Sequence, residues 1–164
     1  MGRHFRQPDP ATISQMFSLL FNRRFTANAS IKMKLGSRDE FTAATFRNEH
    51  GTLIGMVAMD MNMSAAMGCA LSLMPRHVYK GILQSSEFDD MSWENLEEVY
   101  NVATRFFHNA FSGTHIQIDE VFFNPTTMPR EYVRMLRREG RRYDFDCQLH
   151  GYEKGKMVFV GMND

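Results

Sequence analysis

The segment from residue 93 to residue 111 carries the polar side chains with the clearest chemical potential. Glu98 and Asn101 lie three positions apart, a spacing that makes two side chains neighbours on one face of a helix. On a helical wheel the opposite face is apolar and comprises Leu96, Val99, Tyr100, Ala103, Phe106, Phe107 and Ala110. Glu98 and Asn101 are therefore predicted to point away from the core, toward solvent or a partner.

A carboxylate next to an amide can make two kinds of interaction that are useful in catalysis or binding. The carboxylate can pair with a cation, and the amide can orient a water molecule through its carbonyl oxygen and its NH₂ group. The alternative interpretation is the solvent-exposed face of an ordinary amphipathic helix, on which Glu94, Arg105 and His108 also lie. A Glu-x-x-Asn pair is a weak motif, and on spacing alone the ordinary surface is the commoner case.

The elements around this helix predict one α+β domain. A chain of 164 residues is long enough to bury a core of its own, and we predict an extended lead-in over 1–10 followed by a single domain over 11–164. Hydrophobic periodicity and turn residues predict helices at 11–25, 64–73, 76–84, 93–111 and 129–139, and strands at 27–35, 41–48, 52–61, 114–123, 142–151 and 156–161.

Short connections between the first three predicted strands favour antiparallel pairing. The resulting fold class is α+β, with a mainly antiparallel sheet and the long helices Ala11–Phe25 and Trp93–Phe111 packed on one face. Pro75 is expected to end the apolar helix over 64–73.

Composition narrows the class of partner. Lys plus Arg and Asp plus Glu both number 19, so no overall field draws the protein to nucleic acid or to an anionic membrane. A basic cluster comprises Arg130, Arg134, Arg137, Arg138, Arg141 and Arg142. It could anchor phosphate, nucleic acid or an acidic partner, but a solvated surface is the favoured interpretation because no aromatic array accompanies the cluster. No apolar run is long enough to span a bilayer, and a cytoplasmic location is expected. Cys69 and Cys147 are predicted to be buried thiols, and the histidines show no metal-ligand spacing.

Several motifs in order resemble the CheC/CheX/FliY family, and its CheX-type members in particular. A strand ending in Gly55–Asp60 precedes a small-residue helix at Ser64–Leu71, an acidic loop follows, and Glu94–Asn101 and Pro125 come after it. The resemblance implies that Glu98 and Asn101 enter the active site of a phosphorylated, CheY-like response regulator and hydrolyse its aspartyl phosphate. It also implies that Mg²⁺ is carried by the regulator, so this chain needs no metal or cofactor of its own.

Two departures from the family pattern keep an alternative open. The family usually follows its Asn with small residues, whereas this chain has Thr104-Arg105-Phe106. The first predicted helix also lacks a second Glu-x-x-Asn pair. The alternative is therefore a catalytically silent CheX-like interaction module that forms a homodimer through its edge strands or binds a signalling partner.

Overall fold

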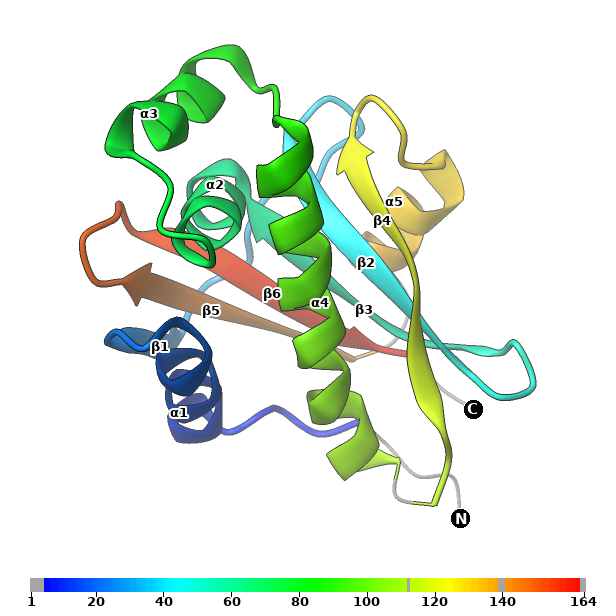
Figure 1. The fold of residues 1–164 in the computed structure, drawn as a ribbon. Helices are drawn as coiled ribbons and strands as arrows, with labels where there is room; N and C mark the ends of the chain where they lie inside the picture. The colour runs from blue at the N-terminus through cyan, green and yellow to red at the C-terminus, as the bar shows by residue number, and fades with distance from the viewer. Residues whose placement is uncertain (1–4, 112, 139–140, 163–164) are drawn as a thin grey trace.

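The computed structural model describes residues 5–111, 113–138 and 141–162. These residues form an α+β fold built on one antiparallel sheet, which confirms the predicted fold class (Figure 1). The strand order is β1 (Phe25–Ala29), β5 (Arg141–Leu149), β6 (Gly155–Gly161), β3 (Leu53–Asp60), β2 (Phe41–Asn48) and β4 (Ile116–Asn124). The helices are α1 (Pro10–Phe21), α2 (Met61–Ala70), α3 (Arg76–Ser85), α4 (Asp90–Ala110) and α5 (Arg130–Arg138).

The sheet is covered on both faces. Helices α1, α2 and α4 lie on one face, as predicted for the long helices, while α3 packs on α2 (Figure 1). On the other face, Val133 and Leu136 of α5 pack against Phe122 and Met56 of the sheet. Within the described residues, no helix combines the length and apolar character needed to cross a membrane.

Helix α4 is fixed at its start by a side-chain cap. The carboxylate of Asp89 accepts a hydrogen bond from the backbone N–H of Ser92 at 2.7 Å, which satisfies one of the donors left free in the first helical turn. The helix therefore begins three residues before the predicted start at Trp93. Leu96, Val99 and Tyr100 are fully buried on the predicted apolar face.

Close packing of α2 against α4 depends on a glycine. A Cβ atom at Gly68 would lie 2.7 Å from the backbone oxygen of Ser92, closer than side-chain carbons approach a carbonyl. Asn95 adds two hydrogen bonds across the same contact, one to the oxygen of Gly68 at 2.9 Å and one to Ser72 Oγ at 2.7 Å. Because Gly68 has no side chain, α4 can pack closely against α2.

The N-terminal helix is shorter than predicted. Asn22 adopts a left-handed conformation with φ 49°, a favoured helix-ending geometry for asparagine, so α1 stops at Phe21 rather than Phe25. Phe25 begins β1 instead, and its N–H donates to Ser18 Oγ at 2.9 Å. Helix α2 likewise ends at Ala70, before Pro75 is reached.

The predicted strand over 27–35 is wrong in extent and in partner. Strand β1 covers only Phe25–Ala29, and it pairs with β5 rather than with the next strand in sequence. The chain then leaves the sheet edge, and the N–H of Met33 donates to the carboxylate of Asp144 at 2.7 Å. Leu35 is buried on the α5 side of the sheet, so this segment runs from the β1 edge onto that face.

The side chain of one member of the predicted basic cluster is largely shielded from solvent. Arg142 pairs with Asp144 at 2.9 Å, with side chains 8% and 3% exposed. Its guanidinium also donates to the backbone oxygens of Met33 and Leu136. Arg142 is therefore a structural cross-link between the 30–40 segment and α5, whereas Arg130, Arg134, Arg137 and Arg141 are exposed as predicted.

Candidate functional site

Glu98 and Asn101 lie on the outward face of α4, and both side chains are exposed. Within the described residues, neither side chain forms a hydrogen bond or an ion pair. The helix beneath them is rigidly held, because the residues between and beside them, Val99 and Tyr100, are fully buried. Helix α4 thus holds the two polar groups on a fixed support, and among the described residues neither group has a side-chain partner.

The two residues share a groove between α4 and the edge strand β4. Its volume is about 540 Å³, and Glu98 and Asn101 form part of the helical wall. Ile118 and Val121 contribute apolar surface from the strand. The remaining lining residues are all acidic: Glu94, Glu97, Asp119 and Glu120.

An irregularity in β4 shapes the strand side of the groove. The pairing of β4 with β2 shifts register between Ala44 and Phe46, so that Asp119 and Glu120 face the single residue Thr45. Such a bulge adds one residue to the strand and changes which side chains share a face. Ile118 and Val121 can therefore both face α4 although three positions separate them.

The two acidic residues of the bulge have different surroundings. Asp119 accepts a hydrogen bond from Arg47 Nε at 2.7 Å, and this bond raises the pKa of the Arg47 guanidinium. Thr45 Oγ1 accepts from the N–H of Glu120 at 3.3 Å. The charge of Asp119 is partly compensated by Arg47, whereas the described residues provide no ion pair for Glu94, Glu97, Glu98 or Glu120.

A buried hydroxyl chain holds α4 in place under the groove. Tyr100 Oη and Ser64 Oγ each lie 2.7 Å from Thr42 Oγ1, and Ser64 donates to the backbone oxygen of Met59. These contacts tie α4 to strand β2 and to helix α2 below the exposed pair. Burial raises the pKa of the Tyr100 phenol, so Tyr100 remains a neutral anchor.

Arg105 lies outside the groove that contains Asn101. It is exposed and lines a separate hollow between α1 and α4, together with Leu19, Leu20 and Val102. Arg105, at which the sequence departs from the family pattern, therefore changes the surface beyond the groove and does not change the lining of the groove. Elsewhere, no group of three or more His, Cys, Asp or Glu side chains in the described part of the chain is arranged to hold a metal ion.

Sequence reasoning identified the helical wall of the groove and missed the strand wall. The available signal was the break in alternation within 116–123, where Ile116 and Ile118 are followed by two acids and then by Val121 and Phe123. That break indicates a bulge. The position of β4 beside α4 could not be predicted from the sequence, because it depends on the order of strands in the sheet.

Comparisons with solved structures identify the fold. The FliM middle domain from H. pylori is similar with a TM-score of 0.66 at 12% identity, covering 93% of this chain and 84% of that one. Thermotoga maritima FliY gives 0.60 at 13% identity over 90% and 81%. A chain of the CheX–CheY complex with BeF₃ and Mg²⁺ from Borrelia burgdorferi gives 0.54 at 13% identity over 95% and 99%.

The likeness lies in the fold and not in the sequence. No protein-family model matches this chain, and no curated protein sequence matches it significantly. The resemblance noted from the sequence motifs is confirmed at the level of architecture, since FliY, CheX-containing and CheC-like structures all align over at least 90% of the chain. The protein therefore has the CheC/CheX/FliY-type fold, which it shares with the FliM middle domain.

Proposed function

We propose that this protein acts on a phosphorylated response regulator and hydrolyses its aspartyl phosphate with Glu98 and Asn101. The observation that supports the proposal is the placement of both side chains. They are exposed, have no partner within the part of the chain that the structure describes, and lie on a rigidly packed helix at an open groove. A solved structure of similar fold contains CheX together with CheY, BeF₃ and Mg²⁺.

The proposed chemistry needs little from this chain beyond positioning. Phosphoryl transfer is accelerated mainly by holding the nucleophile in line and by stabilising charge. Asn101 would orient the attacking water through its amide, which can both donate and accept hydrogen bonds. Glu98 would pair with the lysine of the regulator and fix the register of docking. Mg²⁺ would belong to the regulator, and this chain would hold no cofactor.

The acidic groove favours a regulator over a free phosphate compound. Glu94, Glu97, Glu98 and Glu120 surround Asn101, and like charges repel an isolated phosphate. A regulator brings its own lysine and Mg²⁺, which compensate that repulsion. We therefore expect hydrolysis of a regulator aspartyl phosphate and no measurable hydrolysis of acetyl phosphate alone.

The proposal is tested by following phosphate loss from a CheY-like regulator charged with acetyl phosphate and then freed of it. Addition of the wild-type chain is expected to shorten the lifetime of the phosphoprotein. Glu98→Gln should lose most of this effect, and Glu131→Gln, an exposed glutamate on the other face of the sheet, should retain it. Spontaneous decay that the wild-type chain does not alter would contradict the enzymatic proposal.

A second candidate is a non-catalytic docking module. It is favoured by the similarity to the FliM middle domain, whose TM-score of 0.66 exceeds the 0.54 of the CheX–CheY complex. FliM of H. pylori is also seen in complexes with FliG and with SpeE. Binding of a regulator without accelerated dephosphorylation would select this candidate. A homodimer remains part of this second proposal.

A further inference from the structure

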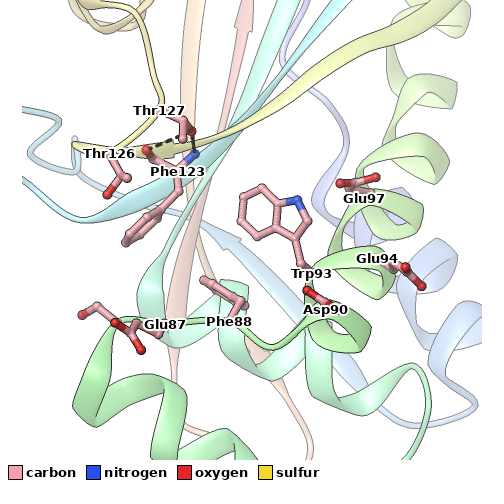
Figure 2. Close-up of a pocket in the computed structure, with 10 residues that line it drawn as sticks. Glu87, Phe88, Asp90, Trp93, Glu94, Glu97, Phe123, Thr126 and Thr127 are labelled. Carbon is pink, nitrogen blue, oxygen red and sulfur yellow. Dashed lines mark hydrogen bonds between the residues drawn. The ribbon is translucent and has the colours of Figure 1, made fainter.

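A second hollow adjoins the groove and is lined by aromatic rings. It has a volume of about 730 Å³ and lies between the loop before α4, the first turns of α4 and the end of β4. Figure 2 shows Trp93 reaching from α4 toward Phe123 of β4, with Phe88 of the preceding loop near both. All three side chains are half-buried, so part of each ring faces the hollow.

The ring of Phe88 is steeply inclined to each of the other two rings. Phe88 and Trp93 have centroids 5.4 Å apart with planes at 67°, and Phe88 and Phe123 have centroids 6.2 Å apart with planes at 74°. Phe88 therefore does not stack on Trp93 or Phe123, and all three rings line the hollow. Aromatic walls of this kind attract an organic cation through the negative faces of their π-systems.

The rim of the hollow carries only acidic charge. Glu87, Asp90, Glu94 and Glu97 line it, and no Lys or Arg does so among the described residues. Glu40 lies at the same edge, where its carboxylate accepts a hydrogen bond from Ser86. Aromatic walls and a carboxylate rim both select a positively charged occupant.

The hollow continues into the α4–β4 groove, which favours an extended occupant. Glu94 and Glu97 line both spaces, so a ligand that fills the aromatic hollow can run along the acidic groove past Asn101. Within the described residues, the indole N–H of Trp93 donates no hydrogen bond. That donor matches a backbone carbonyl, which a peptide has and a simple amine lacks.

We propose that this surface binds a basic peptide segment of a partner protein, with a lysine or arginine side chain in the aromatic hollow and further cations along the acidic groove. The hollow is defined by Phe88, Trp93 and Phe123. The inference goes beyond hydrolysis by Glu98 and Asn101 and does not depend on it. The protein can therefore bind a peptide that contains no phosphate even if it does not hydrolyse the regulator. It can likewise hydrolyse the regulator without binding such a peptide.

The test uses the full chain and a peptide of alternating lysine and alanine, acetylated at its N-terminus and amidated at its C-terminus. A control peptide has glutamine in place of every lysine. Trp93 is the sole tryptophan, so its fluorescence reports directly on the hollow, and calorimetry gives the affinity at low salt. The lysine peptide is expected to change the emission of Trp93 and the glutamine peptide to leave it unchanged. Equal binding of both peptides would overturn the proposal.

Two variants separate the contributions of rings and charges. Phe88→Leu keeps an apolar side chain but removes a π-face and should weaken binding about tenfold, whereas Tyr143→Leu, a half-buried aromatic position on β5, should not. The double variant Glu94→Gln and Glu97→Gln changes only exposed groups and should also weaken binding. Unchanged affinity in both the Phe88→Leu and the double variant would place the peptide elsewhere and overturn the proposal.

Two further measurements distinguish a partner peptide from a small amine and from a second copy of the chain. Choline and its uncharged analogue 3,3-dimethylbutan-1-ol probe the hollow without a peptide backbone, and we expect choline to bind more weakly than the lysine peptide. Choline binding as tightly as the peptide would assign the site to a small amine. Sedimentation of the free chain as an oligomer that the double glutamine variant dissociates would assign it to a second copy. Either result would overturn the proposal.

Discussion

Arg142 illustrates how much a single residue can differ from its sequence neighbours. It lies next to the exposed Arg141, yet it forms a nearly solvent-free ion pair with Asp144 and contacts two backbone oxygens. Removal of one partner from such a pair leaves the other charge buried and uncompensated, which is strongly destabilising. The sequence could not separate these adjacent arginines, because their difference arises from which face of β5 each one occupies.

We predict that Arg142→Ala lowers the free energy of unfolding by about 3 kcal/mol, because the Asp144 carboxylate would lose its compensating charge. Arg141→Ala is the matched control and should change stability by less than about 0.5 kcal/mol. Urea unfolding followed by circular dichroism measures both. Equal, small effects for the two variants would show that the Arg142–Asp144 pair does not hold the 30–40 segment in solution.

The two cysteines are predicted to be inert toward thiol reagents in the folded protein. Cys69 and Cys147 are both buried, and burial raises the pKa of the Cys69 thiol to about 11 and also raises that of Cys147. The thiolate is the reactive form, and it is therefore scarce below the raised pKa and becomes available when unfolding restores the ordinary value. Labelling with a chromogenic disulfide at pH 8 should be slow in buffer and rapid in denaturant. Rapid labelling without denaturant would contradict the burial of both residues.

At the scale of elements, the position of α4 depends on how closely α2 approaches it. Gly68 permits this approach, since any Cβ there would meet the backbone of Ser92 at 2.7 Å. Gly81 lies in α3, where an added Cβ would meet nothing within 4 Å. The two helical glycines therefore form a matched pair that separates a packing requirement from ordinary helix propensity.

We predict that Gly68→Ala destabilises the protein by about 1–3 kcal/mol, because α2 and α4 must move apart. Gly81→Ala should instead stabilise it by about 0.5–1 kcal/mol, because alanine is the better helix former. Thermal unfolding of the two variants gives the comparison. A stabilising effect of both substitutions would mean that the α2–α4 contact is looser than the structure has it.

Most elements could be predicted from the sequence because their apolar spacing is strong. The helix around Glu98 and the hairpin of β2 and β3 both follow directly from periodicity and turn residues. The end of α1 was missed because Asn22 stops the helix although the apolar pattern continues to Phe25. The pairing of β1 with β5 was missed because contacts between strands so distant in sequence leave no local signal.

At the scale of the whole molecule, charge is segregated although the net charge is zero. Carboxylates gather at the α4–β4 groove and the adjoining aromatic hollow. Three exposed arginines, Arg130, Arg134 and Arg137, lie on α5, which packs on the opposite face of the sheet. A local field of this kind can orient an approaching partner even when the overall charge cannot attract it.

We predict that docking of a phosphorylated regulator weakens as salt is added. At 0.1 M salt, attraction between the carboxylates of the groove and the lysine and Mg²⁺ of the regulator is screened beyond a distance of about 10 Å. A rise in NaCl from about 0.05 M to about 0.5 M should increase the KM for the regulator severalfold and leave kcat nearly unchanged. A KM independent of salt would show that the acidic groove takes no part in docking.

A paired measurement on Asn101 decides whether this side chain carries the proposed hydrolysis. The lifetime of the phosphoryl group on a charged regulator is measured with wild-type chain, with Asn101→Ala and with Asn28→Ala, an exposed asparagine on β1 at the other edge of the sheet. We predict that Asn101→Ala abolishes the acceleration with a melting temperature close to wild type, since exposed substitutions change stability by at most about 0.5 kcal/mol, and that Asn28→Ala retains it. Full acceleration by a folded Asn101→Ala variant would contradict the account.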